Sequence, residues 1–250
     1  MGAQKHFLAD AAHQMKTPLA GLRMQAELAQ REIDAGGDPQ AVKRSLKQIA
    51  RSSQSAAHLV NQLLAMARAE DSEQARRQQD VPLIKLAREV VRDFVPRAMD
   101  KRIDLGYEGP ETDPASPRVT GQPVLVRELI RNLVDNALQY TPAGGTVTVR
   151  LMPDPYGQVM VLQVEDTGPG IPEAEREQVF QPFYRALGTD VDGSGLGLAI
   201  VKEIADKHAA TVAVTNAITV PANSGQAPGA LFTVRFACVP PPALPAAAPP

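Results

Sequence analysis

The chain has 250 residues, 44% hydrophobic and 22% charged, a composition typical of a soluble protein with one or two ordinary cores. Its 26 Lys and Arg residues nearly balance 28 Asp and Glu residues, so the net charge of −2 provides no basic field for a nucleic-acid backbone. Tryptophan is absent and aromatic residues make up only 4%, which argues against a stacking platform for bases or sugars.

The cysteine content and the hydropathy pattern bear on the redox compartment of the protein and on whether these residues cross a membrane. The one cysteine, Cys238, cannot form an internal disulfide or a zinc cluster, which favours a reducing compartment. No stretch approaches the roughly 18 uninterrupted apolar residues of a membrane helix, and no cleavage pattern follows Met1. We therefore expect any membrane anchor to lie outside these residues.

Apolar residues in the first part of the chain recur at alternating intervals of four and three, which is the heptad seam of a packed helix. Turn residues at 35–39 interrupt the pattern, which then resumes, so residues 1–70 are predicted to form a helical hairpin. Because two helices leave apolar flanks uncovered, we expect two hairpins to pair as a four-helix bundle in a homodimer. The seam comprises Leu8, Ala12, Met15, Leu19, Leu22, Ala26, Ala29 and Ile33, then Val42, Leu46, Ile49, Ser53, Ala56, Val60, Leu63 and Ala67.

A polar linker without a heptad is predicted at residues 71–79, followed by a second domain at 80–238. The order of elements in this domain indicates an α+β fold with a mixed sheet covered on one face. The Pro- and Ala-rich tail, 239–250, is expected to be disordered. The expected helices are Leu83–Met99, Pro123–Gln139 and Leu198–Lys207, and the expected strands are Ile103–Tyr107, Thr146–Met152, Val159–Glu165, Val212–Thr215 and Leu231–Ala237.

The first segment with chemical potential surrounds His13, which falls beside the heptad seam at a position facing solvent. Thr17 follows one helical turn later on the same side, and Pro18 is expected to bend the helix there. A neutral imidazole in this place can act as a nucleophile. Taken alone, however, an exposed helical histidine is more often an ordinary surface residue.

A polar stripe is predicted on the second helix of the α+β domain, where Glu128, Asn132, Asn136 and Tyr140 follow one another at intervals of four. Asparagine is a poor residue for a helix interior, so two in one stripe suggest neutral oxygen ligands for Mg²⁺, with water and phosphates completing the coordination. The alternative is a solvated helix face.

Two glycine-rich runs are the last sequence features with a potential chemical role. Asp166 ends an apolar strand just before Gly168 and Gly170, where its carboxylate can accept a hydrogen bond from the exocyclic amine of adenine. The run Asp192–Leu198 opens a helix, so backbone amides there can approach phosphate. Each run alone could be a plain turn. The spacing fits neither a P-loop nor a dinucleotide fingerprint.

Taken in order, these motifs resemble those of sensor histidine kinases of bacterial two-component systems over nearly the whole chain. The resemblance includes the run Phe180–Arg185 as a further motif. It implies a phosphotransfer hairpin followed by a Bergerat-type (GHKL) α/β sandwich that binds ATP and Mg²⁺, with His13 as phospho-acceptor and a lid at about 184–194. Catalytic roles are implied for His13, Gln14, Thr17, Asn132 and Arg185; metal binding for Asn136 and Asn132; and nucleotide binding for Asn132, Asn136, Tyr140, Asp166, Gly168, Gly170, Phe183, Arg185, Gly193, Gly195, Gly197 and Leu198.

Two positions depart from the family pattern. The residue after the acceptor histidine is usually acidic, but here it is Gln14; the residue before Tyr140 is often basic, but here it is Gln139. Both changes concern rates rather than the reaction class. The sequence of the segment from His13 to Pro18 looks most like that of the subgroup that regulates tricarboxylate uptake.

The resemblance implies autophosphorylation of His13 and transfer to an aspartate of a response regulator, in the cytoplasmic portion of a bacterial inner-membrane sensor kinase. Phosphatase activity toward the regulator is a further expectation, and nucleic acid is not an expected partner. An ATP-hydrolysing machine on the same fold would need a carboxylate to activate water, at the position that Asn132 occupies. A dimeric scaffold with a degenerate pocket fits poorly with intact glycine motifs and an intact Asn pair.

Overall fold

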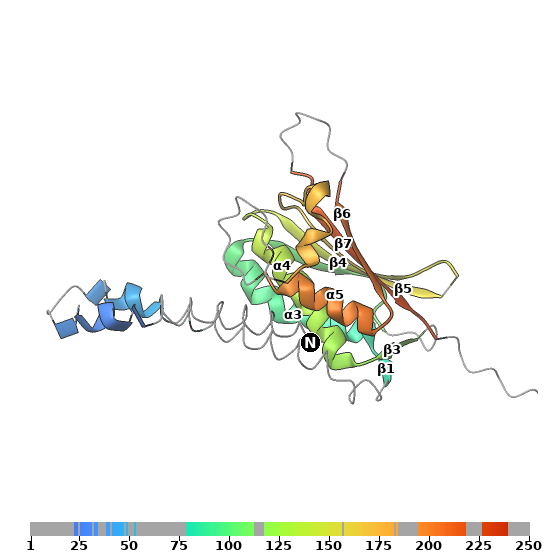
Figure 1. Ribbon diagram of the computed structural model, residues 1–250, viewed down its shortest axis with the longest axis horizontal. Coiled ribbons are helices and arrows are strands. Elements are labelled where there is room, and N and C mark those ends of the chain that lie inside the picture. Colours follow the sequence, from blue (N-terminus) through green and yellow to red (C-terminus); the bar gives the residue numbers. More distant parts are fainter. Residues whose placement is uncertain are drawn as a thin grey trace, which may run out of the picture. The chain divides into compact units, whose positions relative to one another are not determined.

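A computed structural model of the chain describes residues 79–112, 118–156, 158–182, 184, 195–218 and 227–239, together with scattered residues between 23 and 53. The chain divides into two compact units, Met1–Ala67 and Arg68–Pro250 (Figure 1). The segment around His13 and the tail from 240 onward lie outside the described residues. The predicted boundaries at 70, 79 and 238 stay predictions.

In the first unit, every described residue between 23 and 53 is helical. Arg23 and Glu27 form an ion pair one turn apart, with 2.9 Å between Nε and Oε1. The seam residue Ala29 is buried, whereas the seam residues Ile33 and Leu46 are 60% and 54% exposed in the single chain. Part of the predicted apolar seam is therefore uncovered in one copy of the chain.

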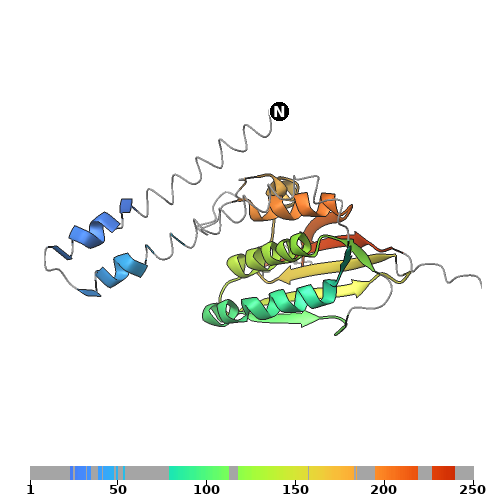
Figure 2. The ribbon, with the colours of Figure 1, turned by 90° about the horizontal axis from the view of Figure 1, so that it is seen from below.

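The second unit is an α+β sandwich, as the sequence predicts. Its five-stranded sheet has the order β2-β4-β5-β7-β6, in which β2 and β4 are parallel and the other pairs are antiparallel. Three helices cover one face of this sheet, with α4 between α3 and α5 (Figure 2). The elements are β1 (Gln79–Val81), α3 (Leu83–Lys101), β2 (Asp104–Glu108), β3 (Val119–Gly121), α4 (Pro123–Tyr140), β4 (Thr146–Pro153), β5 (Val159–Asp166), η2 (Glu173–Glu175), η3 (Gln178–Phe180), α5 (Gly197–Lys207), β6 (Thr211–Asn216) and β7 (Ala230–Ala237).

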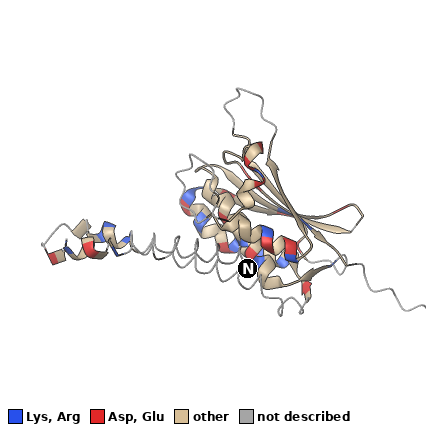
Figure 3. Cartoon of the chain, viewed as in Figure 1, with Lys and Arg blue, Asp and Glu red and all other residues tan. Residues whose placement is uncertain are grey.

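The core lies between the sheet and the three helices. Strand β7 alternates between buried and accessible positions, so Phe232 and Phe236 point to the same side as the buried residues of β4 and β5. The helices supply Leu129, Ile130 and Leu133, all fully buried, to the opposite side of the core. Burial of these apolar side chains is the main stabilising term of the unit. Charged residues are more frequent along the helices than along the sheet (Figure 3).

The sequence pattern does not predict the small antiparallel sheet of β1 and β3, in which Val81 pairs with Val119. Each strand has three residues, too few for a period of two to be recognised. Strand β1 begins at Gln79, which the sequence places in the linker.

Helix α4 ends at Tyr140 because Pro142 follows Thr141 and disfavours a helical Thr141.

Candidate nucleotide-binding site

The polar stripe of α4 is present but is not a uniformly solvated face. Asn132 is only 4% exposed, and Glu128, Asn136 and Tyr140 are half-buried. The amide nitrogen Nδ2 of Asn132 donates to the backbone oxygen of Glu128 at 2.9 Å and lies 3.3 Å from its carboxylate Oε1. A buried amide in such a network requires a fixed orientation, which a merely solvated face does not.

Asp166 lies at the end of β5 and is 4% exposed. Its Oδ1 accepts hydrogen bonds from the backbone N–H groups of Gly168 at 2.8 Å and Ala230 at 3.3 Å. Burial raises the pKa of this carboxyl, although the two N–H groups act in the opposite direction. Within the described part of the chain these bonds use Oδ1 alone, so Oδ2 is the oxygen left for a further donor.

The two glycines after Asp166 are required by close packing. A Cβ on Gly168 would lie 2.8 Å from Oδ1 of Asp166 and 3.0 Å from the backbone oxygen of Tyr140. Gly170 has a φ of 76°, and a Cβ there would approach the oxygen of Gly229 to 2.8 Å. The structure therefore brings the Asp166 loop directly against the last residue of α4.

The second glycine run is described from Gly195 onward. Gly195 has a φ of 69°, which an L side chain rarely adopts, and Gly197 is the first residue of α5. Leu196 is fully buried and anchors this helix start, while Leu198 is half-buried. Helix α5 packs against α4, the helix that carries the Asn132 stripe. Amides at such a helix start suit a phosphate.

The structure brings Tyr140, at the end of the helix that carries Asn132 and Asn136, against Gly168 in the loop that follows Asp166. The side chains of Asn132 and Asn136 offer the neutral oxygens that Mg²⁺ accepts beside water and phosphate. The predicted residues Gly170, Gly195, Gly197 and Leu198 are also among the described residues, whereas His13, Gln14, Thr17, Phe183, Arg185 and Gly193 lie outside them.

Lys101 is a site neighbour that the sequence gives no reason to single out. Its Nζ donates to the backbone oxygens of Leu138 at 2.6 Å and Gln139 at 3.1 Å, and so stabilises the carboxyl end of α4. Partial burial lowers the pKa of Lys101, and Arg97 lowers it further. These partners lie 37 and 38 residues away, a pairing that no local pattern indicates.

The chain matches two known domain families. Residues 121–240 match the family described as histidine kinase-, DNA gyrase B- and HSP90-like ATPase, and residues 3–72 match the His Kinase A (phospho-acceptor) domain. The chain is 36% identical over 217 residues to sensor protein QseC of Escherichia coli K12, which covers 87% of this chain and 46% of QseC. It is 38% identical over 207 residues to sensor protein kinase PmrB of Pseudomonas aeruginosa PAO1, covering 82% of this chain and 41% of PmrB.

A solved structure shows the same fold. The histidine kinase ThkA, in complex with response regulator protein TrrA, superimposes with a TM-score of 0.66 at 21% sequence identity, covering 94% of this chain and 62% of that one.

A one-sided α+β sandwich that follows a helical phospho-acceptor segment defines the class of two-domain histidine kinase cores. The chain belongs to the sensor histidine kinases of bacterial two-component systems. It spans less than half the length of QseC and PmrB, at 46% and 41%. Among the described residues, no helix is both long and apolar enough to cross a membrane.

Proposed function

We propose that this chain is an ATP-dependent protein-histidine kinase that phosphorylates His13 and passes the phosphoryl group to an aspartate of a response regulator. The observation that carries the proposal is the buried Asp166, whose Oδ1 is held by two backbone N–H groups beside the end of α4. Such a carboxylate suits recognition of an amine within a shielded pocket.

Asp166 would read adenine through its second oxygen. Oδ2 can accept a hydrogen from the exocyclic amine, whereas guanine offers a carbonyl at the equivalent position and would face another acceptor. Because Oδ1 is already fixed by Gly168 and Ala230, the carboxylate keeps one orientation when the nucleotide arrives. Tyr140, whose backbone contacts the same loop, would complete this end of the pocket.

Mg²⁺ would be held by Asn136, with help from Asn132, and by the nucleotide phosphates. When bound, the ion supplies neutralisation of the charge on the triphosphate. Gly193, Gly195 and Gly197 would allow backbone amides near Leu198 to approach the phosphates. Phe183 and Arg185 would complete the site, with the Arg185 guanidinium stabilising negative charge that develops during transfer.

In the transfer step, a nitrogen of His13 attacks the γ-phosphorus in line, an N–P bond forms, and the bond to the β,γ-bridging oxygen breaks to release ADP. The imidazole also loses a proton. Gln14 has no carboxylate to accept it, so this proton must reach water or another base. Asn132 is neutral at the position where an ATPase of this fold would need a base, which favours phosphoryl transfer over hydrolysis.

A response regulator is the proposed second substrate. ThkA, which shares the fold, was solved in complex with response regulator protein TrrA, and this supports a similar partner for the present chain. Thr17, one helical turn after His13, would serve dephosphorylation of that partner by orienting a water molecule.

The active form is proposed to be a homodimer. Exposure of the seam residues Ile33 and Leu46 in the single chain supports pairing of two hairpins into a four-helix bundle, which would cover these side chains. The subgroup that regulates tricarboxylate uptake remains our proposal for the finer class. We also propose that the chain is the cytoplasmic portion of an inner-membrane sensor kinase, since QseC and PmrB are sensor proteins of about twice its length.

The test is incubation with γ-labelled ATP and Mg²⁺, followed by treatment of the labelled protein with acid and with alkali. A phosphoramidate on histidine is lost in acid and survives alkali, and His13→Ala should abolish the label while nucleotide binding persists. A label that survives acid, or that remains in the His13→Ala variant, would overturn the proposal.

A further inference from the structure

We propose that Glu128 is a positioning residue that fixes the side-chain amide of Asn132, so that the carbonyl oxygen Oδ1 rather than the NH₂ group is presented to the metal-nucleotide complex. The inference rests on the proposed function, because it concerns how Asn132 meets Mg²⁺-ATP. It adds a residue one helical turn before the Asn pair to the machinery of this site.

The contacts of Asn132 define which way its amide faces. Nδ2 lies 2.9 Å from the backbone oxygen of Glu128 and 3.3 Å from its Oε1, and both of these atoms are acceptors. A rotation of the amide by half a turn would set Oδ1 against the same two oxygens, replacing two attractive contacts by two repulsive ones. The backbone oxygen and the carboxylate of Glu128 therefore together favour the orientation in which Oδ1 faces away from both.

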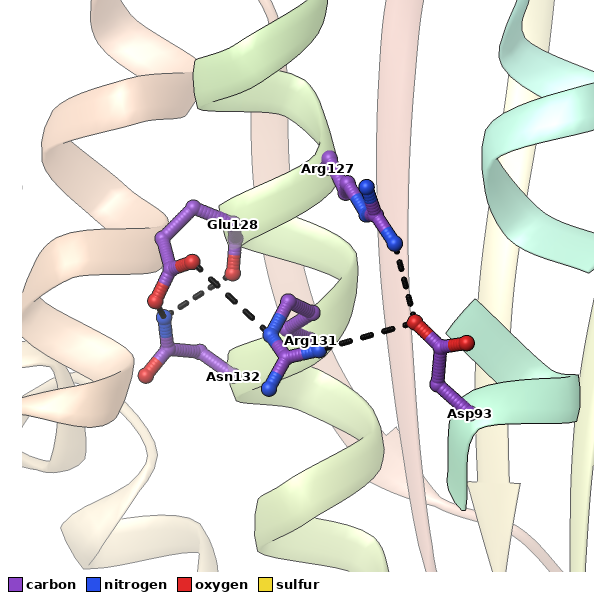
Figure 4. A network of polar contacts seen from close by, with 5 residues as sticks. All are labelled: Asp93, Arg127, Glu128, Arg131 and Asn132. Atoms are coloured by element: carbon purple, nitrogen blue, oxygen red, sulfur yellow. Dashed lines mark hydrogen bonds and ion pairs between the residues drawn. The ribbon is translucent and has the colours of Figure 1, made fainter. Parts of the chain in front are cut away.

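The side chain of Glu128 is itself held in place. Nε of Arg131 lies 3.9 Å from its Oε2, and the other end of Arg131 approaches Oδ2 of Asp93 on α3 to 3.8 Å. Arg127 pairs with the same Asp93 oxygen at 2.9 Å. Figure 4 shows Arg131 between Glu128 on one side and Asp93 on the other.

The guanidinium of Arg131 lies over the ring of Phe94, with 5.3 Å between Cζ of Arg131 and the ring centroid. Phe94 is itself buried, so its ring offers a fixed surface to the guanidinium. The Asp93–Arg131–Glu128 chain thus restricts the rotamers of Glu128 and, through Glu128, the amide of Asn132.

The same contacts argue against a role for Glu128 as a general base for water. Its Oε1 faces the Asn132 amide and its Oε2 faces Arg131, so both carboxylate oxygens already have cationic or N–H neighbours. A carboxylate that activates water needs an oxygen directed at that water. Glu128 is accordingly expected to act through Asn132 and not on a reacting atom.

The experiment compares Glu128→Ala, which removes the side-chain acceptor and leaves the backbone oxygen, with Glu128→Gln, which keeps a side-chain acceptor oxygen and loses the charge. Glu89→Ala on α3 is the matched control, because Glu89 is also half-buried on a helix. The first readout is the pair of Asn132 side-chain NH₂ resonances in relaxation-optimised spectra of the full, ligand-free chain, identified by their loss in Asn132→Ala. The second readout is affinity for ATP measured by calorimetry with Mg²⁺ and, separately, with a chelator.

We expect Glu128→Ala to shift the Asn132 resonances and to speed their hydrogen exchange. It should weaken Mg²⁺-ATP roughly fivefold to tenfold, the value of one buried hydrogen bond, while leaving metal-free ATP affinity unchanged. Glu128→Gln should restore both readouts to within about twofold, and Glu89→Ala should match the wild type.

Two results would overturn the inference. One is an Asn132 amide signal that is the same in Glu128→Ala and in the wild type; the other is a Glu128→Gln variant as impaired as Glu128→Ala, because then charge and not the acceptor would matter. If the wild type itself fails to bind Mg²⁺-ATP, the proposed function fails, and the resonances of the ligand-free protein still decide whether Glu128 fixes the amide.

Discussion

The imidazole of His208 accepts a hydrogen bond at Nε2 from the backbone N–H of Gln122, which lies 3.0 Å away and 86 residues earlier in the chain. Its other nitrogen, Nδ1, lies 2.7 Å from the carbonyl oxygen of Ile204 and therefore carries the proton. Gln122 is the N-cap of α4, and His208 is the C-cap of α5. The neutral imidazole thus joins the ends of the two helices that bear the candidate site.

This contact predicts a stability that depends on pH. Burial lowers the pKa of His208; the Ile204 carbonyl raises it in part, and Lys207 lowers it again. At mildly acidic pH, the native state therefore binds fewer protons than the unfolded chain, in which the pKa of this histidine is about 6.5. The stabilisation is complete above that pH and is lost as the pH falls toward the lower folded pKa.

The measurement is the urea midpoint at about pH 7.5 and about pH 5. The midpoint of the wild type should fall more between these values than that of His208→Gln, whose amide oxygen can accept the Gln122 hydrogen without titrating. Equal falls in both proteins would show that His208 does not carry the dependence.

Gly121 is predicted to be intolerant of any side chain. A Cβ there would lie 2.2 Å from Cδ2 and 2.6 Å from Nε2 of His208, whose ring is held at both nitrogens. We expect Gly121→Ala to lower the free energy of unfolding by about 1–3 kcal/mol, the usual cost of overpacking. Gly106→Ala in β2 is the matched control, since nothing lies within 4 Å of its Cβ. A Gly121→Ala variant as stable as Gly106→Ala would contradict the packing argument.

Asp166→Asn should separate ATP binding from folding. The new amide can keep an oxygen for the N–H groups of Gly168 and Ala230, but its NH₂ then replaces Oδ2 and opposes the amine of adenine. We expect ATP affinity to fall by roughly tenfold or more. The thermal midpoint should not fall, because burial already disfavours the charged Asp166, as its raised pKa indicates. Calorimetry with ATP and with GTP checks the role, which equal ATP binding by both proteins would reject.

The sequence predicts the elements of the second unit well where a periodic pattern of apolar residues extends over a long segment. The period of α4 over Pro123–Tyr140 and the alternation of β7 over Ala230–Ala237 both lead to the observed elements, because side-chain periodicity reflects which face is buried. The short strands β1 and β3 are missed because pairing between distant residues, not local propensity, creates them.

The polar stripe of α4 is predictable from the sequence, but its supporting contacts are not. The spacing of Asn132 and Asn136 suffices to predict one stripe on α4. It does not indicate that the Asn132 amide is buried against Glu128, nor that Lys101 stabilises the end of the same helix. Both features depend on side-chain rotamers or on packing of α3 against α4, which a one-dimensional pattern does not contain.

Gln14→Glu is expected to speed autophosphorylation. A carboxylate next to His13 can accept or orient the imidazole proton, whereas an amide cannot act as a base. The initial rate of labelling with saturating ATP should rise by roughly tenfold or more, with little change in ATP affinity. Gln30→Glu, at an exposed helical position of the same unit, controls for the added charge. If both variants label at the wild-type rate, proton removal does not limit the forward reaction.

Thr17→Ala is expected to impair dephosphorylation of the phosphorylated regulator while sparing the labelling of His13. Dephosphorylation requires only a hydroxyl that orients the attacking water by hydrogen bonds, and Thr17 lies one helical turn from His13. Thr17→Ser, which retains the hydroxyl, should recover most of the lost activity. Both activities should be measured for each variant with the cognate regulator. If Thr17→Ala slows labelling as much as dephosphorylation, the side chain supports helix geometry beside Pro18, and a separate phosphatase role must be withdrawn.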